Sequence, residues 1–140
     1  MRRNLRCHCG QSLVEFALVL PLLLVLTFGI IEFGIMLFNQ QILTNASREG
    51  ARAGIVSQTP RVPYASIDSV VQNYCAAHLI TFGTRNPPQT IVSPTPYNPS
   101  ALFGSDLTVQ VSYQYSFLII PSFILGTSGS MQAVTVMKYE

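Results

Sequence analysis

A run of apolar residues near the N-terminus constrains this chain more than any other feature of its sequence. It extends from Leu13 to Phe38, 26 residues interrupted only by Glu15, Thr27, Glu32, two glycines and a proline. About 20 apolar residues are enough for a helix to cross the roughly 30 Å hydrocarbon core of a bilayer. A helix buried in a soluble domain rarely stays apolar on all faces for so long. The run therefore predicts a membrane-spanning helix.

Twelve residues precede this run, and the first ten of them contain three arginines and end at Gly10. A secretory signal peptide is cut after an apolar region of about 7–15 residues, next to small side chains. The sequence Thr44-Asn45-Ala46 is only a weak version of such a site, and here the apolar run is longer and contains carboxylates. A cut between Gly10 and Gln11 would instead leave the helix as an anchor and give Gln11 a free amino group.

Two carboxylates lie within the apolar run, where a charge costs about 3 kcal/mol at the centre of a bilayer. Glu15 follows the expected amine of Gln11 by four residues. It either reaches the headgroups or pairs with that amine, on its own chain or a neighbour's, which would fix the register of an assembly. Glu32 lies 17 residues further on, and is either an interfacial glutamate in water or a contact with another subunit.

The helix is expected to continue past the membrane through residues 39–56, where apolar residues recur at helical spacing. Ala46, Gly50 and Gly54 form a stripe of small residues that permits another backbone to approach closely. The neighbour on this stripe is either the chain's own strands or an adjacent subunit, and the adjacent subunit is the interpretation we favour from sequence.

Charged residues accompany this stripe. Arg48 and Arg52 share a helix face at i,i+4, a mildly repulsive arrangement, and Glu49 is placed to pair with Arg52 at i,i+3. We therefore include all three residues in the expected helix-packing region.

The remaining 84 residues, 57–140, predict a small α+β domain. A helix is expected from Ser66 to Ile80, with Ser66 as its N-cap. Strict alternation predicts a strand from Leu107 to Phe117. A second strand is expected from Met131 to Tyr139, and Thr90 to Val92 is a candidate edge strand. Such a domain is small for an independent core, so the long helix is expected to complete it.

Charge and cysteine content exclude several functions. Without the first ten residues, five basic residues face six acidic ones, which gives no electrostatic footprint for nucleic acid. Cys7, His8 and Cys9 lack a second cluster of ligands, so we expect no metal site. Cys75 is expected to be a buried thiol. The sequence has no catalytic motif and no cofactor motif, and predicts a protein that is not an enzyme.

The segments GQSLVEFALVLPLLLVLTFGIIEFG and REGARAGIV resemble the TadE-like family of pseudopilins, from the tight-adherence branch of type IV pilus systems. The resemblance covers roughly residues 10–56. It implies cleavage after Gly10 by a prepilin peptidase of the aspartic type, and it matches Glu15 and Glu32 to glutamates of the family. Phe16 replaces the tyrosine common in the major pilin of such systems, and the major pilin is far shorter, which favours a minor subunit.

The resemblance therefore implies a leader at 1–10, a membrane helix at 11–38, a helical continuation at 39–56 and an exported domain at 57–140. Expected partners are other pilins, the prepilin peptidase, the inner-membrane assembly platform and the lipid bilayer. The implied role is in pilus biogenesis, surface adherence and biofilm growth. The alternative is a membrane-anchored envelope protein that stays outside any filament and whose exported domain binds a surface or another protein.

Overall fold

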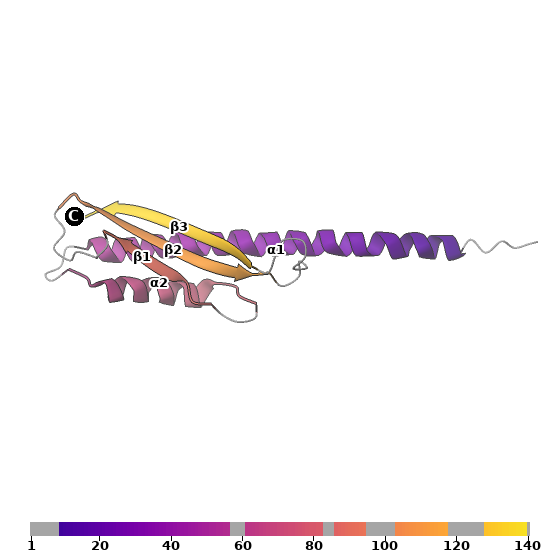
Figure 1. Cartoon of the computed structure of the whole chain (residues 1–140), viewed down its shortest axis with the longest axis horizontal. Helices are drawn as coiled ribbons and strands as arrows, with labels where there is room; N and C mark the ends of the chain where they lie inside the picture. Colours follow the sequence, from indigo (N-terminus) through magenta and orange to yellow (C-terminus); the bar gives the residue numbers. More distant parts are fainter. Residues whose placement is uncertain (1–8, 57–60, 83–85, 95–102, 118–127, 140) are drawn as a thin grey trace, which may run out of the picture.

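The computed structural model describes residues 9–56, 61–82, 86–94, 103–117 and 128–139. Within these residues, five elements follow one another (Figure 1). They are α1 (Cys9–Ile55), α2 (Tyr64–His78), β1 (Gln89–Ser93), β2 (Asp106–Ser116) and β3 (Ser128–Lys138). A long apolar N-terminal helix, one short helix and an antiparallel sheet make up the predicted α+β fold, which is confirmed.

The sheet has the strand order β1-β2-β3, with both neighbouring pairs antiparallel. Val109 in the middle strand lies opposite Val92 of β1 and Thr135 of β3. The buried side chains of β2 are the alternating residues Leu107, Val109, Val111, Tyr113 and Tyr115. This alternation confirms the strand predicted from period-two patterning, because successive side chains of a strand point to opposite faces.

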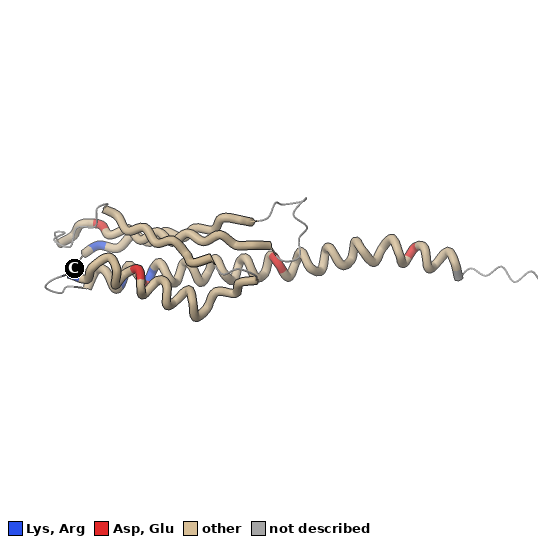
Figure 2. Tube along the Cα trace, turned by 60° about the horizontal axis from the view of Figure 1, so that its bottom comes forward, with Lys and Arg blue, Asp and Glu red and all other residues tan. Residues whose placement is uncertain are grey.

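The sheet covers a layer formed by α2 and the C-terminal part of α1, as the cartoon (Figure 1) and the tube view (Figure 2) show. The buried core contains residues of the long helix, the short helix and the strands. From α1 it takes Leu43, Ala46 and Ala51, and from α2 it takes Ile67, Val71 and Cys75. The long helix thus completes the core of the small domain, as its size required.

The helix boundaries differ from the predicted ones by a few residues. α1 begins at Cys9, two residues before the predicted start of the membrane helix at Gln11, and ends at Ile55, one residue before the predicted end of its continuation at Val56. α2 begins at Tyr64, and its N-cap is Pro63, which makes no side-chain capping bond. Ser66 therefore lies inside the helix, and the prediction that it caps α2 is wrong: its backbone N–H already donates to the Pro63 carbonyl at 3.0 Å.

Candidate functional site

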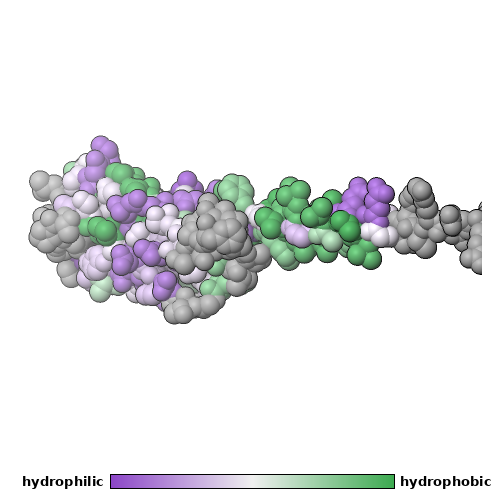
Figure 3. Space-filling model, turned by 45° about the vertical axis from the view of Figure 1, so that its right-hand side comes forward, coloured by the Kyte–Doolittle hydropathy of each residue, from purple (hydrophilic) through white to green (hydrophobic). Residues whose placement is uncertain are grey.

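The N-terminal part of α1 extends away from the domain without a covering layer (Figure 3). Within residues 10–31, which we call the free segment, all side chains are exposed except at the half-buried Gly29. A window of this helix has a mean hydropathy of 2.5 and no burial, and α1 is long and apolar enough to cross a membrane. At 1.5 Å per residue the 22 residues span about 33 Å, close to the roughly 30 Å of a hydrocarbon core.

The predicted cleavage site lies at the exposed start of this free segment. Gly10 lies within α1, and a Cβ built on it would meet no atom within 4 Å. Gln11, Val14, Glu15 and Leu18 line one shallow, open hollow beside it. Gln11 and Glu15 therefore share one face of the helix. In this uncut chain the nitrogen of Gln11 is a peptide nitrogen, so the pair expected from sequence stays a prediction.

Glu32 marks the point at which the domain begins to cover α1. Its side chain is 1 % exposed, and one carboxylate oxygen accepts a 2.7 Å hydrogen bond from the Tyr115 hydroxyl. Burial raises the pKa of Tyr115, and the hydrogen bond to the Glu32 carboxylate raises it further, because both favour the neutral phenol. The burial of Glu32 contradicts the interpretation as a glutamate in water and gives the side chain a partner on the same chain, whereas a contact with another subunit stays a prediction.

The course of β2 explains why this partner was missed. Leu107 lies against Gly54, Val109 against Gly50, and Tyr115 against Glu32. The strand therefore runs antiparallel to α1 and brings its last tyrosine to the place where the free segment ends. Separation by 83 residues hides this pair from sequence. The available signals were a carboxylate in an apolar run and a tyrosine on the buried side of a strand, each of which needs a polar partner.

The stripe of small residues faces the chain's own core. A Cβ on Gly50 would lie 2.6 Å from Cγ2 of Val71, and one on Gly54 would lie 2.5 Å from Cδ2 of Leu107. Ala46, one turn earlier, is fully buried. The preference for an adjacent subunit on this stripe is therefore corrected. The glycines allow α2 and β2 to approach α1 closely, and the intramolecular neighbours leave no room for another helix there.

The charged residues near this stripe lie on the other side of the helix. Arg48, Glu49 and Arg52 are all exposed, and no ion pair joins Glu49 to Arg52, although both residues belong to the described part of the chain. These three residues face away from the core. We call residues 32–55 the packed segment, and its exposed side remains available to a partner.

Polar contacts that sequence reasoning missed fix the packed segment to the domain. The fully buried Asn39 donates from Nδ2 to the Ile80 carbonyl at 2.8 Å and accepts from the Ile80 N–H at 3.0 Å. Gln40 donates to the backbone carbonyl of Gln132 in β3, also at 2.8 Å. The sequence signal for these contacts was an asparagine directly after an apolar run. It does not indicate which residue the asparagine bonds to.

Cys75 lies in the core on α2, as predicted for a buried thiol. Burial raises its pKa from 9.0 to about 11, because the thiolate loses its hydration there. The thiol is therefore protonated at neutral pH, which makes it a poor nucleophile.

Comparison with known proteins bears on the long helix. Residues 10–52 match the model of a family described as TadE-like protein. No curated protein and no solved structure matches the chain significantly. The resemblance inferred from sequence is thus confirmed over a segment that begins at Gly10 and includes the free segment and most of the packed one. The sheet and α2 lie outside the match.

Proposed function

We propose that this chain is a minor pilin or pseudopilin of a tight-adherence type IV pilus system, because residues 10–52 match the model of the TadE-like family, a structural family of pilin-like proteins. It acts in pilus biogenesis and surface adherence, as an anchored subunit without enzymatic activity. Its partners are other pilins, the prepilin peptidase and the inner-membrane assembly platform.

The observation that carries this proposal is the division of α1 at Glu32. The free segment has the length of one membrane crossing, and the α+β domain covers the helix immediately beyond it. A subunit with this form has a membrane anchor and a head that belong to one continuous helix. In the proposed orientation the domain lies outside the cytoplasm and the leader inside.

Processing by a prepilin peptidase is supported by the exposure of the Gly10–Gln11 bond and by the open space around Gly10. The cut gives Gln11 an amino group one helical turn from Glu15, on the same face. Within a bundle of such helices, the amine and the carboxylate neutralise each other, on one chain or between neighbours, and set the axial register.

An N-terminal mass measurement on the membrane-extracted protein tests processing. We expect a chain that starts at Gln11 in cells with the peptidase and at Met1 in cells without it. Gly10→Val should block the cut by crowding the scissile backbone, while the control Gly34→Val, at a second open glycine of α1, should be cut normally. A chain that keeps Met1 despite an active peptidase would contradict the proposal.

A second candidate function is a membrane-anchored envelope protein that stays outside filaments and binds a surface through its domain. A cavity on the domain, described below, favours such a binding role. Sheared filament fractions separate the two candidates, because a pilin subunit is recovered in them together with its partners, whereas a plain anchor remains with the membrane.

A further inference from the structure

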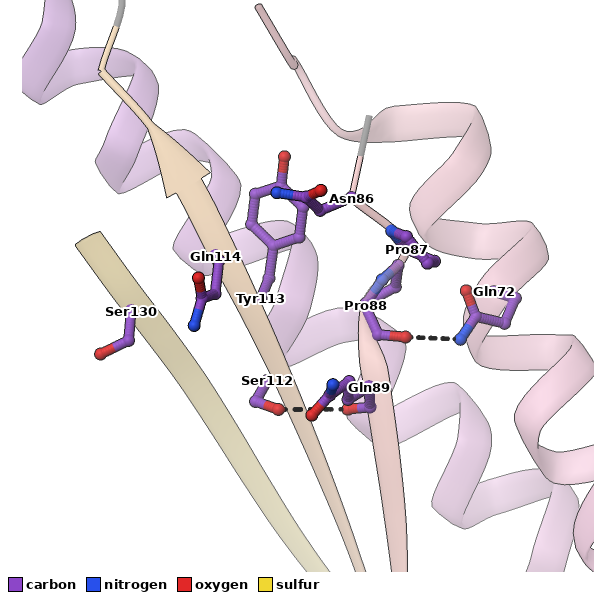
Figure 4. Close-up of a pocket in the computed structure, with 9 residues that line it drawn as sticks. All are labelled: Gln72, Asn86, Pro87, Pro88, Gln89, Ser112, Tyr113, Gln114 and Ser130. Carbon is purple, nitrogen blue, oxygen red and sulfur yellow. Dashed lines mark hydrogen bonds between the residues drawn. The ribbon is translucent and has the colours of Figure 1, made fainter. Parts of the chain in front are cut away.

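The domain has an open cavity of about 560 Å³ at the edge of the sheet, beside the start of β1 (Figure 4). Its walls come from α2, from the residues that lead into β1, and from all three strands. The lining residues are Gln72, Asn86, Pro87, Pro88, Gln89, Ser112, Tyr113, Gln114 and Ser130. None of the functional residues discussed above takes part in it.

Two prolines create this cavity. β1 begins to pair with β2 at Gln89, opposite Ser112, whereas β2 and β3 remain paired beyond this level, as at Gln114 opposite Ser130. Pro87 and Pro88 precede Gln89 and have no N–H to donate to the ladder. The Pro88 carbonyl instead accepts a 2.7 Å hydrogen bond from Gln72 of α2. The chain therefore leaves the sheet toward α2, and a hollow opens beside β2.

The described residues of the lining are neutral. They contribute four carboxamides, two serine hydroxyls, one tyrosine and two proline rings. Among the described residues, Asp68 is a charged neighbour of the lining and accepts a 3.3 Å hydrogen bond from Gln72. Carboxamides and hydroxyls both donate and accept hydrogen bonds. Because Tyr113 and Pro88 are buried, the cavity offers both kinds of polar contact beside the exposed ring of Pro87.

We propose that this cavity binds an uncharged saccharide. Sugar hydroxyls donate and accept hydrogen bonds, which matches carboxamides and serines, and a C–H face of a sugar ring packs on the exposed ring of Pro87. The volume lies within the about 300–1,000 Å³ of small-molecule sites. An anionic sugar would lose hydration here without gaining a cationic partner among the described residues. Addition of a peptide strand to the edge of β2 beyond Ser112, where β1 is no longer paired, is the alternative that a peptide probe tests.

This inference deepens the proposed function, on which it rests only for the location of the domain outside the cytoplasm. Binding itself is a property of the isolated full-length chain. A subunit with such a site would bring a neutral glycan to the pilus or envelope surface.

Ligand-observed saturation-transfer NMR on the full chain tests the proposal, in a zwitterionic detergent that has no sugar headgroup. The probes are lactose, chitobiose and maltotriose, with sialyllactose and a neutral tetrapeptide for comparison. We expect transfer to at least one neutral sugar and none to sialyllactose at equal concentration. Gln114→Ala should weaken binding about three- to tenfold, the effect of one lost hydrogen bond.

The matched control is Gln110→Ala, which changes the same residue type on the same face of β2, outside the cavity. Its affinity should stay within about twofold of the unaltered chain. Failure of all three neutral sugars to bind, equal losses in both variants, or binding of the tetrapeptide alone would each overturn the proposal. Gln114→Ala should still be processed and recovered with pilins, so failure of sugar binding and failure of the assembly role are separate results.

Discussion

The free and packed segments of α1 belong to one continuous helix, yet their side chains have opposite surroundings. In the free segment every face is apolar and exposed, whereas in the packed segment Leu43 and Ala46 are fully buried and Arg48 is exposed. The two glutamates differ in the same way: Glu15 is exposed, and Glu32 is bonded to Tyr115. Identical residue types therefore have different roles, because lipid surrounds one segment in the proposed orientation and the domain covers the other.

Substitution of glycines should reveal the largest difference in stability between the two segments of α1. Gly50→Leu inserts a side chain where a Cβ alone would be 2.6 Å from Val71, so we expect a loss of about 3 kcal/mol in the stability of the domain. Gly29→Leu, in the free segment, adds its side chain in open space and should leave that stability unchanged. Thermal unfolding in detergent and limited proteolysis measure both. A protease-resistant Gly50→Leu chain that loses only its pilin partners would restore the inter-subunit interpretation.

The glutamates give the next largest effect. Glu32→Ala removes the acceptor of a buried tyrosine hydroxyl, which should cost about 2 kcal/mol of domain stability. Glu32→Gln keeps an acceptor oxygen and should cost less. Glu15→Ala should leave stability and processing unchanged and weaken assembly, since it removes the proposed partner of the Gln11 amine. Urea unfolding and co-purification with pilins read out the two effects. Equal destabilisation by Glu15→Ala and Glu32→Ala would remove the distinction between the segments.

A smaller effect is expected at the contact between α1 and the end of α2. Asn39→Ala deletes both hydrogen bonds to the Ile80 backbone. Because Ile80 is exposed and water replaces part of the loss, we expect a cost of about 1 kcal/mol. Asn45→Ala, at a half-buried position of the same helix, is the matched control and should change little. Hydrogen exchange at the Ile80 amide should rise only in the Asn39 variant.

The smallest effect on stability at neutral pH is expected at Cys75. Its thiol reports on whether the core between α1 and α2 stays closed to solvent. Its folded pKa of about 11 exceeds the ordinary 9.0, so the unfolded chain loses the thiol proton first. The contribution of Cys75 to stability is therefore complete below pH 9.0 and falls as the pH rises toward 11. In a Cys7→Ser, Cys9→Ser background, alkylation at pH 8 should be slow until urea is added. Rapid alkylation of the folded chain would show that the core opens.

Much of the fold follows from local patterns in the sequence. The apolar run predicts the long helix, since a continuous apolar stretch of this length has few alternatives. The alternation from Leu107 to Phe117 predicts β2 because the side-chain period of a strand is two. Neighbouring residues likewise predict the cleavage after Gly10 and the pairing of Glu15 with the Gln11 amine. Both roles stay predictions that the experiments above test.

Local sequence patterns predict which segments are helix and strand, which stretch is apolar enough to cross a membrane, and a resemblance of roughly residues 10–56 to the TadE-like family. What those segments contact depends on the tertiary structure. The direction of β2 along α1 brings Tyr115 to Glu32 and Leu107 to Gly54, while α2 places Val71 against Gly50. A hollow opens where the chain at Pro87 and Pro88 lies outside the sheet. Local patterns report which face of an element avoids water, and many partners satisfy that requirement equally well. The choice among them depends on packing between residues far apart in the chain.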